Sequence, residues 1–254
     1  MIVEGRREIR LAIAGGHAPV ELFYCTERFR GGESAQVVEA CRAAGAGLVA
    51  CDAAAFDKVA YRENPDGLLA VAPLIRRRLA DLRVPDPGLL VIVEAIEKPG
   101  NLGTILRTAD AAGAHGVVVC DRCTDLGNPN VIRASLGTLF TVPVAEATTD
   151  EAIGWLRSRG IRILAATPHA TTLYTDADMT GPTAIALGAE QNGLSEIWMQ
   201  AADARVRIPM LGRADSLNVS ASATILLYEA VRQRGLRGCV PTGADSARQR
   251  PVGR

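Results

Sequence analysis

The second part of the chain alternates short apolar runs with helical segments, and this alternation limits the possible folds more than any other feature. Apolar runs of strand length are followed by segments whose apolar residues recur with helical spacing. Such alternation predicts a mainly parallel sheet that is covered by helices on both faces. Strands are expected at residues 89–94, 116–121, 161–167, 184–190 and 205–209, and helices at 101–113, 130–136, 150–159 and 218–234.

A stretch with two prolines interrupts the periodic pattern at residues 81–88, DLRVPDPG, and it predicts a boundary between two units. The unit before it is a small α/β module, with strands expected at 21–25, 47–51 and 67–73 and helices at 37–45 and 53–60. From Gly235 onward, Gly, Pro, Ser and Arg dominate, which is typical of disorder. The predicted organisation is a small α/β domain at 1–80, a linker at 81–88, a larger domain at 89–236 and a disordered basic tail at 237–254.

Composition argues against several classes of protein. No apolar run approaches the roughly 20 residues that cross a bilayer, and the N-terminus contains Glu4 and Glu8 instead of an apolar signal core. We therefore expect an intracellular, cytoplasmic protein without a membrane partner. The six cysteines are scattered, and the CxxC formed by Cys120 and Cys123 has no second pair and no ligating histidine nearby. No metal site is predicted.

The formal net charge of zero argues against binding of nucleic acid by a general positive field, but it allows local basic patches. Residues 232–254 hold six arginines and one aspartate. Taken alone, each basic cluster is better explained by a solvated helix face or a disordered tail than by a role in binding. Two further clusters are candidate RNA contacts: Arg6, Arg7 and Arg10 near the start, and Arg76, Arg77 and Arg78 before the predicted linker.

The stretch IEKPGNLGTILRTADAAGAHGVVVCD, residues 96–121, has the strand, turn and helix of a nucleotide-binding corner. It contains neither GxGxxG nor GxxxxGK[ST], which argues against a dinucleotide-dependent oxidoreductase and against a P-loop kinase. On its helix, Arg107 lies about 140° from Leu102 and therefore points away from the apolar stripe. A surface ion pair with Asp110 would also explain this arginine.

Two later stretches contribute polar residues to similar corners. ALGAEQNGLSEIW, residues 186–198, places Glu190 between Gly188 and Gly193, and IPMLGRADSLNVSASA, residues 208–223, contains Ser216 and Asn218, both good helix N-caps. In an open parallel sheet, corners at the carboxyl ends of the strands form the ligand crevice. The predicted site residues at these corners are Asn101, Arg107, Glu190, Ser216 and Asn218.

Together the three stretches resemble the motifs of the SpoU/TrmH family of RNA 2′-O-ribose methyltransferases, in the family's order and spacing. NPNVIRASLGTLFTVPV, residues 128–144, is similar to the family's intervening segment, and the resemblance covers residues 89–234. The N-terminal part resembles the family's L30e-like substrate-binding domain. The resemblance implies a trefoil-knotted α/β methyltransferase (SPOUT) domain preceded by the L30e-like domain, S-adenosylmethionine as cofactor, RNA as substrate and a homodimer with sites near the subunit interface.

The resemblance also assigns residues. It places Asn101, Arg107, Glu190, Ser216 and Asn218 on the catalytic side. It places a second set around the cofactor: Thr167, Gly188, Ile208 and Leu217.

Chemistry limits what Arg107 can do. As a general base it would need its pKa of about 12.5 to fall by roughly five units, at a cost of about 7 kcal/mol. We therefore prefer Arg107 as a cation that stabilises the developing alkoxide to Arg107 as a general base. Glu190 is expected to hold Arg107 by an ion pair. The predicted reaction is 2′-O-methylation of a ribose in structured RNA. 23S ribosomal RNA is favoured because a separate N-terminal RNA-binding module is present; transfer RNA, or a non-catalytic RNA-binding relative, remains the alternative.

Overall fold

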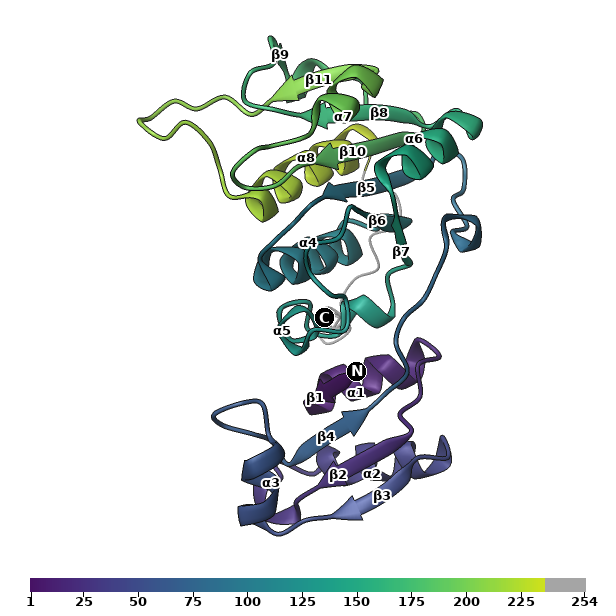
Figure 1. Ribbon diagram of the computed structural model, residues 1–254, viewed down its shortest axis with the longest axis vertical. Coiled ribbons are helices and arrows are strands. Elements are labelled where there is room, and N and C mark those ends of the chain that lie inside the picture. Colours follow the sequence, from purple (N-terminus) through teal and green to yellow (C-terminus); the bar gives the residue numbers. More distant parts are fainter. Residues whose placement is uncertain (236–254) are drawn as a thin grey trace, which may run out of the picture.

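The computed structural model describes residues 1–235, which form two α/β units stacked end to end (Figure 1). The N-terminal unit contains a four-stranded sheet in the order β1-β4-β2-β3, in which only β2 and β3 are parallel. The predicted small α/β module is therefore present. Its elements are β1 (Ile2–Glu4), α1 (Arg6–Ala14), β2 (Glu21–Tyr24), α2 (Glu33–Ala43), β3 (Gly47–Ala50), α3 (Ala53–Val59) and β4 (Leu68–Val71).

The larger unit contains a seven-stranded sheet in the order β7-β6-β5-β10-β8-β11-β9, and every neighbouring pair is parallel. The predicted parallel sheet is confirmed, and β7 and β9 are strands that the periodicity did not indicate. The trefoil knot stays a prediction, because strand order alone does not establish it. The strands are β5 (Leu89–Glu94), β6 (Gly116–Cys120), β7 (Val144–Ala147), β8 (Arg162–Ala166), β9 (Thr172–Leu173), β10 (Thr183–Leu187) and β11 (Ala204–Arg207).

Helices cover both faces of this sheet, because successive residues of its central strands point to opposite sides. On β5, Val91 and Val93 pack in one apolar cluster with α4 (Pro99–Ala111), α5 (Pro129–Ala134) and α8 (Val219–Gln233). Leu90 and Ile92 pack in the other cluster with α6 (Thr149–Ser158) and α7 (Glu196–Ala201). Helix α4 begins at Pro99, two residues earlier than predicted, since proline suits the first position of a helix.

The two units share one hydrophobic core instead of being separated by a free linker. Helix α1 lies against the turn at residues 138–140, where a Cβ added to Gly15 would stand 2.1 Å from the Phe140 carbonyl oxygen. The rings of His17 and Phe140 are 5.9 Å apart. Leu82, inside the predicted linker, is buried in the cluster under α6. The boundary at 81–88 therefore does not separate two independent apolar patterns.

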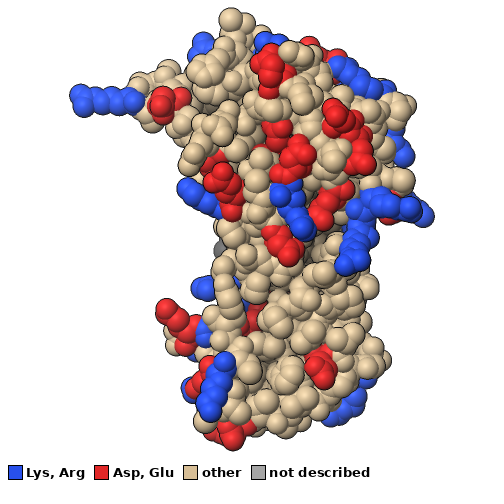
Figure 2. All heavy atoms as spheres, in the orientation of Figure 1, with Lys and Arg blue, Asp and Glu red and all other residues tan. Residues whose placement is uncertain are grey.

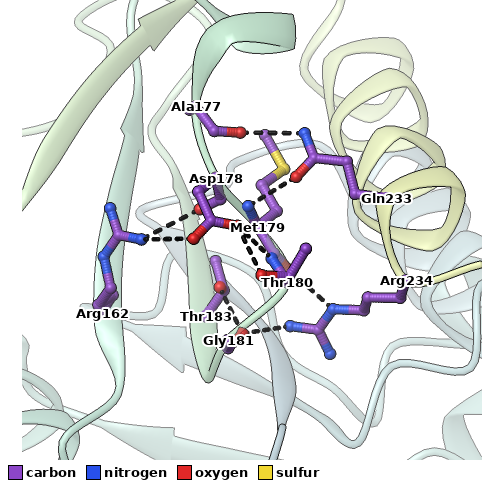
Figure 3. Close-up of polar contacts among 9 residues, drawn as sticks. All are labelled: Arg162, Ala177, Asp178, Met179, Thr180, Gly181, Thr183, Gln233 and Arg234. Carbon is purple, nitrogen blue, oxygen red and sulfur yellow. Dashed lines mark hydrogen bonds and ion pairs between the residues drawn. The ribbon is translucent and has the colours of Figure 1, made fainter.

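Arg234 joins the end of α8 to two distant segments, and Figure 3 shows its contacts with the segment that contains Met179 and Gly181. Its guanidinium donates from Nε to Met179 O at 2.9 Å and from Nη2 to Gly181 O at 2.6 Å and Gly88 O at 3.0 Å. Burial lowers the pKa of this guanidinium below its usual value. The neighbouring Gln233 accepts from Met179 N at 2.8 Å. Arg234, counted in the basic cluster at 232–254, is therefore a structural residue.

We expect Arg234→Ala to lower the free energy of unfolding by about 2–3 kcal/mol, because hydrogen bonds to a charged group are strong and the carbonyl oxygens lose their donor. Chemical denaturation of purified protein measures the change. Arg42→Ala is the matched control: Arg42 forms an exposed ion pair with Glu39 at 2.6 Å, and its loss should cost about 0.5 kcal/mol or less. Equal losses in the two variants would contradict the structural role of Arg234.

Several remaining expectations concern absent features or the chain end. No helix within residues 1–235 is long and apolar enough to cross a membrane. In the same range, no group of histidine, cysteine and carboxylate side chains could hold a metal ion. Cys120 is buried in β6, which raises the pKa of its thiol to about 12, whereas Cys123 is exposed. The predicted tail at 237–254 lies outside the described residues.

Candidate active site

Three of the predicted site residues meet at the carboxyl edge of the large sheet. Asn101, in the first turn of α4, donates from Nδ2 to Oε1 of Glu190, which follows β10. Asn218, immediately before α8, donates from Nδ2 to Asn101 Oδ1 at 3.1 Å. These contacts join residues that are 89 and 117 positions apart in the sequence. Asn101 therefore links the three stretches that sequence analysis identified separately.

Asn218 also caps α8, as predicted. Its Oδ1 accepts from Ser220 N at 3.0 Å and from Ser220 Oγ at 2.6 Å. One turn further along, the Thr108 and Thr224 hydroxyls lie 3.2 Å apart and connect α4 with α8. The Asn218 side chain is thus held in place by the helix that it caps, and it presents its amide to Asn101.

Arg107 is exposed and lies on a different side of α4 from Asn101. It stands one turn after Gly103, which packs so closely on α5 that an added Cβ would lie 2.5 Å from the Ala134 Cβ. Arg107 consequently emerges next to α5. Within residues 1–235 it forms neither the ion pair with Glu190 nor the pair with Asp110 that the sequence allowed, since Glu190 contacts Asn101 and Asp110 accepts from Thr141 at 3.4 Å.

Ser216 lies apart from this network. It is exposed in the loop between β11 and α8, which projects from the molecule at the left of Figure 1. Its hydroxyl contacts only the neighbouring Asp215 side chain, at 3.4 Å, among the contacts of the described residues. Leu217 in the same loop is also exposed.

The other cofactor candidates follow three neighbouring strands. Thr167 comes after β8, Gly188 after β10 and Ile208 after β11, so their strand ends lie side by side. Thr167 N donates to Val206 O at 2.9 Å, which fixes the end of β8 against β11. A Cβ added to Gly188 would lie 2.0 Å from the carbonyl carbon of Gly193, so glycine is required there by packing. This edge offers backbone groups and an apolar side chain to a ligand.

Glu94 is a polar residue at this edge that sequence analysis missed. It ends the otherwise apolar strand β5, is buried, and accepts from Ser195 N at 2.7 Å. That bond secures the base of the loop at residues 188–195, which carries Glu190. The sequence did contain a signal for Glu94, because a carboxylate stands there at the end of an apolar run and next to a predicted strand-to-helix corner. Burial of Glu94 indicates a role in positioning the loop.

The predicted RNA-contacting arginines occupy two separate places. Arg6 and Arg10 pair with Glu33 at 3.3 and 3.8 Å, while Arg7 is exposed. The run at 76–78 lies in the connection that enters β5 at its amino end, away from the candidate site, and this connection follows the right edge of Figure 1. Acidic and basic side chains are interspersed over the face shown in Figure 2, in keeping with the neutral net charge.

A parallel sheet with helices on both faces, and with polar side chains gathered at the carboxyl ends of its strands, defines an α/β protein of the class that binds its ligand at that edge. The model of the SpoU rRNA Methylase family matches residues 88–228, and that of the MRM3-like substrate binding domain matches residues 1–70. The chain belongs to the SpoU rRNA Methylase family. The resemblance found in the sequence is thereby confirmed.

Relatives and solved structures agree with this membership. A 23S rRNA (uridine(2479)-2′-O)-methyltransferase from Streptomyces viridochromogenes is 37% identical over 178 residues, which cover 68% of this chain and 62%, less than two thirds, of that protein. The 23S rRNA (guanosine-2′-O-)-methyltransferase RlmB from Ralstonia nicotianae is 33% identical over 205 residues, covering 78% and 82%. The crystal structure of the SpoU methyltransferase AviRb from Streptomyces viridochromogenes with the cofactor AdoMet is 32% identical, with a TM-score of 0.83 and coverage of 92% and 90%.

Proposed function

We propose that the protein methylates the 2′-hydroxyl of a ribose in 23S ribosomal RNA with S-adenosylmethionine as methyl donor. The observation that carries this proposal is the convergence of Asn101, Glu190 and Asn218 at the carboxyl edge of the large sheet. Membership in the SpoU rRNA Methylase family supports it, as do relatives that are named as 23S rRNA 2′-O-methyltransferases.

The strand ends next to this network suit the proposed cofactor. The tight turn at Gly188 keeps the backbone free of a side chain, while Thr167, Ile208 and Leu217 offer a hydroxyl and apolar surface for an adenosine group. When bound, S-adenosylmethionine supplies an electrophilic methyl group. Glu94 holds the loop that follows Gly188 through its bond to Ser195 N.

The catalytic side has to orient the ribose and stabilise the charge that develops on its oxygen. Asn101 and Asn218 are held by each other and provide amide groups for orientation, with Glu190 fixing Asn101. Arg107 supplies the cation for the developing alkoxide and for a neighbouring phosphate, and Ser216 contacts the ribose from the projecting loop. The proton of the hydroxyl leaves to water or to a phosphate oxygen.

Two copies of the chain form the functional unit in this proposal. Large apolar side chains are exposed on the projecting loop and on α8, including Leu211, Leu217 and Tyr228. A second copy would cover them and bring further groups to the exposed Arg107. Residues 1–80 bind the RNA, with Arg6, Arg7 and Arg10 as contacts, and Arg76, Arg77 and Arg78 contact flanking RNA. The protein acts in the cytoplasm, where ribosomal RNA is available.

Mapping of 2′-O-methyl groups in total RNA, from cells with and without the gene, tests the proposed reaction. We expect one position of 23S ribosomal RNA to lose its methyl group without the gene. Loss of a methyl group from transfer RNA instead would favour the alternative substrate. Unchanged methylation in all RNA would favour a non-catalytic RNA-binding protein.

We expect Gly188→Ala to weaken S-adenosylmethionine binding by about tenfold or more, a change of about 1.4 kcal/mol, because the added methyl group must displace the backbone of Gly193. Calorimetric titration of the folded variant measures this affinity. Gly154→Ala in α6 is the matched control, since nothing lies within 4 Å of its added Cβ. Normal affinity in folded Gly188→Ala would move the cofactor away from this turn.

A further inference from the structure

The junction between the two units presents a tyrosine to solvent. Tyr61 lies in the loop between α3 and β4, and 50% of its surface is exposed. Its hydroxyl oxygen accepts a hydrogen bond of 2.7 Å from Nδ2 of Asn130, in the first turn of α5. The ring of Tyr61 therefore belongs to the N-terminal unit, while its tip is fixed by the larger unit.

Two buried carboxylates hold this loop in place. Glu4 Oε2 accepts from Tyr61 N at 2.8 Å and from Arg62 N at 3.0 Å, and Glu8 Oε1 accepts from Arg62 Nη2 at 2.8 Å. Glu4 is only 6% exposed and Glu8 only 4%. Burial raises the pKa of the Glu4 carboxyl. Burying carboxylates is costly unless they are well paired, and here their partners belong to an exposed loop. The position of Tyr61 is therefore preorganised.

Helix α5, which holds the hydroxyl of Tyr61, also carries a positive charge. Arg133 lies one turn after Asn130 on the same side of α5, is exposed, and has no ion-pair partner within residues 1–235. An exposed aromatic ring, together with an arginine one turn from the residue that holds the ring, is a combination with which proteins bind an unpaired nucleobase and its phosphate. An aromatic ring can stack on any base, so such a contact positions the RNA without a strict preference for its nucleotide sequence.

The junction connects directly with the helix of the candidate active site. Helix α5 packs on α4 at Gly103, whose added Cβ would lie 2.7 Å from Val131 O. Helix α4 carries Asn101 and Arg107. The loop before β4, α5 and the start of α4 all lie on the side of the molecule from which the loop between β11 and α8 projects (Figure 1).

We propose that Tyr61, Asn130 and Arg133 form a contact for an unpaired nucleotide of the RNA substrate. The base stacks on the Tyr61 ring, Arg133 binds its phosphate, and Asn130 fixes the ring. The contact sets the distance along the RNA between the part held by the N-terminal unit and the methylated ribose. This inference rests on the proposed function, because it assumes an RNA substrate.

Equilibrium binding to two synthetic RNAs, a hairpin with an unpaired loop and a blunt-ended duplex of equal length, tests the contact. Tyr61→Ala should weaken hairpin binding by about tenfold or more and leave duplex binding unchanged. Tyr61→Phe keeps the stacking ring and loses only the bond from Asn130, so it should weaken hairpin binding by a smaller factor, about two- to fivefold. Arg133→Gln should weaken hairpin binding and reduce its salt dependence. Val59→Ala is the matched control, because Val59 is also 50% exposed and ends α3 just before the loop.

Unchanged hairpin affinity in Tyr61→Ala would overturn the inference, and so would equal losses on hairpin and duplex, since these indicate a general effect on the fold. The melting temperature of each variant identifies such an effect independently. Failure of the proposed function has a different signature: the unaltered protein would transfer no methyl group to ribosomal RNA, whatever the effect of Tyr61→Ala on hairpin binding.

Discussion

Arg107→Ala should reduce methyl transfer by at least about 10²-fold, the scale expected when a group that stabilises a developing oxyanion is removed. Affinity for S-adenosylmethionine should stay nearly unchanged, because Arg107 emerges beside α5 and not at the ends of β8, β10 and β11. Single-turnover methylation of ribosomal RNA and calorimetric titration of the cofactor measure the two quantities separately. A normal rate would remove Arg107 from the mechanism, and an equal loss of rate and cofactor affinity would place it on the cofactor side.

Arg107→Lys separates charge from geometry, because lysine keeps the charge but loses the planar fork. If a group with a lowered pKa removes the proton, the lysine variant should regain activity as the pH is raised, since more of its amine is then neutral. If the guanidinium instead binds the alkoxide and a phosphate together, activity should stay low at every pH. We expect the second result.

Removal of residues 1–80 should destabilise the larger unit as well as abolish methylation of ribosomal RNA. The shared core loses every residue that the N-terminal unit contributes, and Phe140, which α1 covers in the full chain, becomes exposed. Loss of the packing around one large aromatic residue costs about 3–5 kcal/mol. We therefore expect a clearly lower melting temperature and aggregation, measured by thermal unfolding and light scattering. The linker predicted at 81–88 would instead leave an independently folded remainder, which the shared core argues against.

Two glycine variants test the same junction without a deletion. Gly15→Ala forces a Cβ toward the Phe140 carbonyl oxygen, whereas Gly32→Ala in the same unit places its Cβ in open space. Only Gly15→Ala should lower the melting temperature. A shortened protein as stable as the full chain, together with equal melting temperatures for Gly15→Ala and Gly32→Ala, would show that the junction contributes nothing to stability.

Much of the fold could be predicted from the sequence because it depends on how apolar residues are spaced along each strand and helix, which is a local property. The apolar runs of β5, β6 and β10 are buried on both faces, so their sequence alone indicates central parallel strands. Strand β1 and helix α1 were missed. The strand has only three residues, and the arginines of α1 conceal the buried positions Ile9 and Ala12.

The sequence identified the strand-to-helix corners that contribute to the candidate site. It did not identify which side chains contact one another there. Capping preference identified Asn218 correctly, because capping is a local property. The partner of Glu190 was wrong: it is Asn101 instead of Arg107. That choice depends on how α4 is rotated, which Gly103 settles by packing on α5. The Tyr61–Asn130 contact was equally inaccessible, since it joins residues 69 positions apart across two units.

The late position of α8 in the chain has a consequence for biosynthesis. Asn218 contacts Asn101, and Arg234 contacts Gly88, which lies 146 positions earlier. A nascent chain that has exposed the first motif outside the ribosome therefore still lacks the groups that complete the site. Translation must therefore proceed as far as α8 before this edge of the sheet can function. Truncated translation products should accordingly be inert toward the ribosomes that release them.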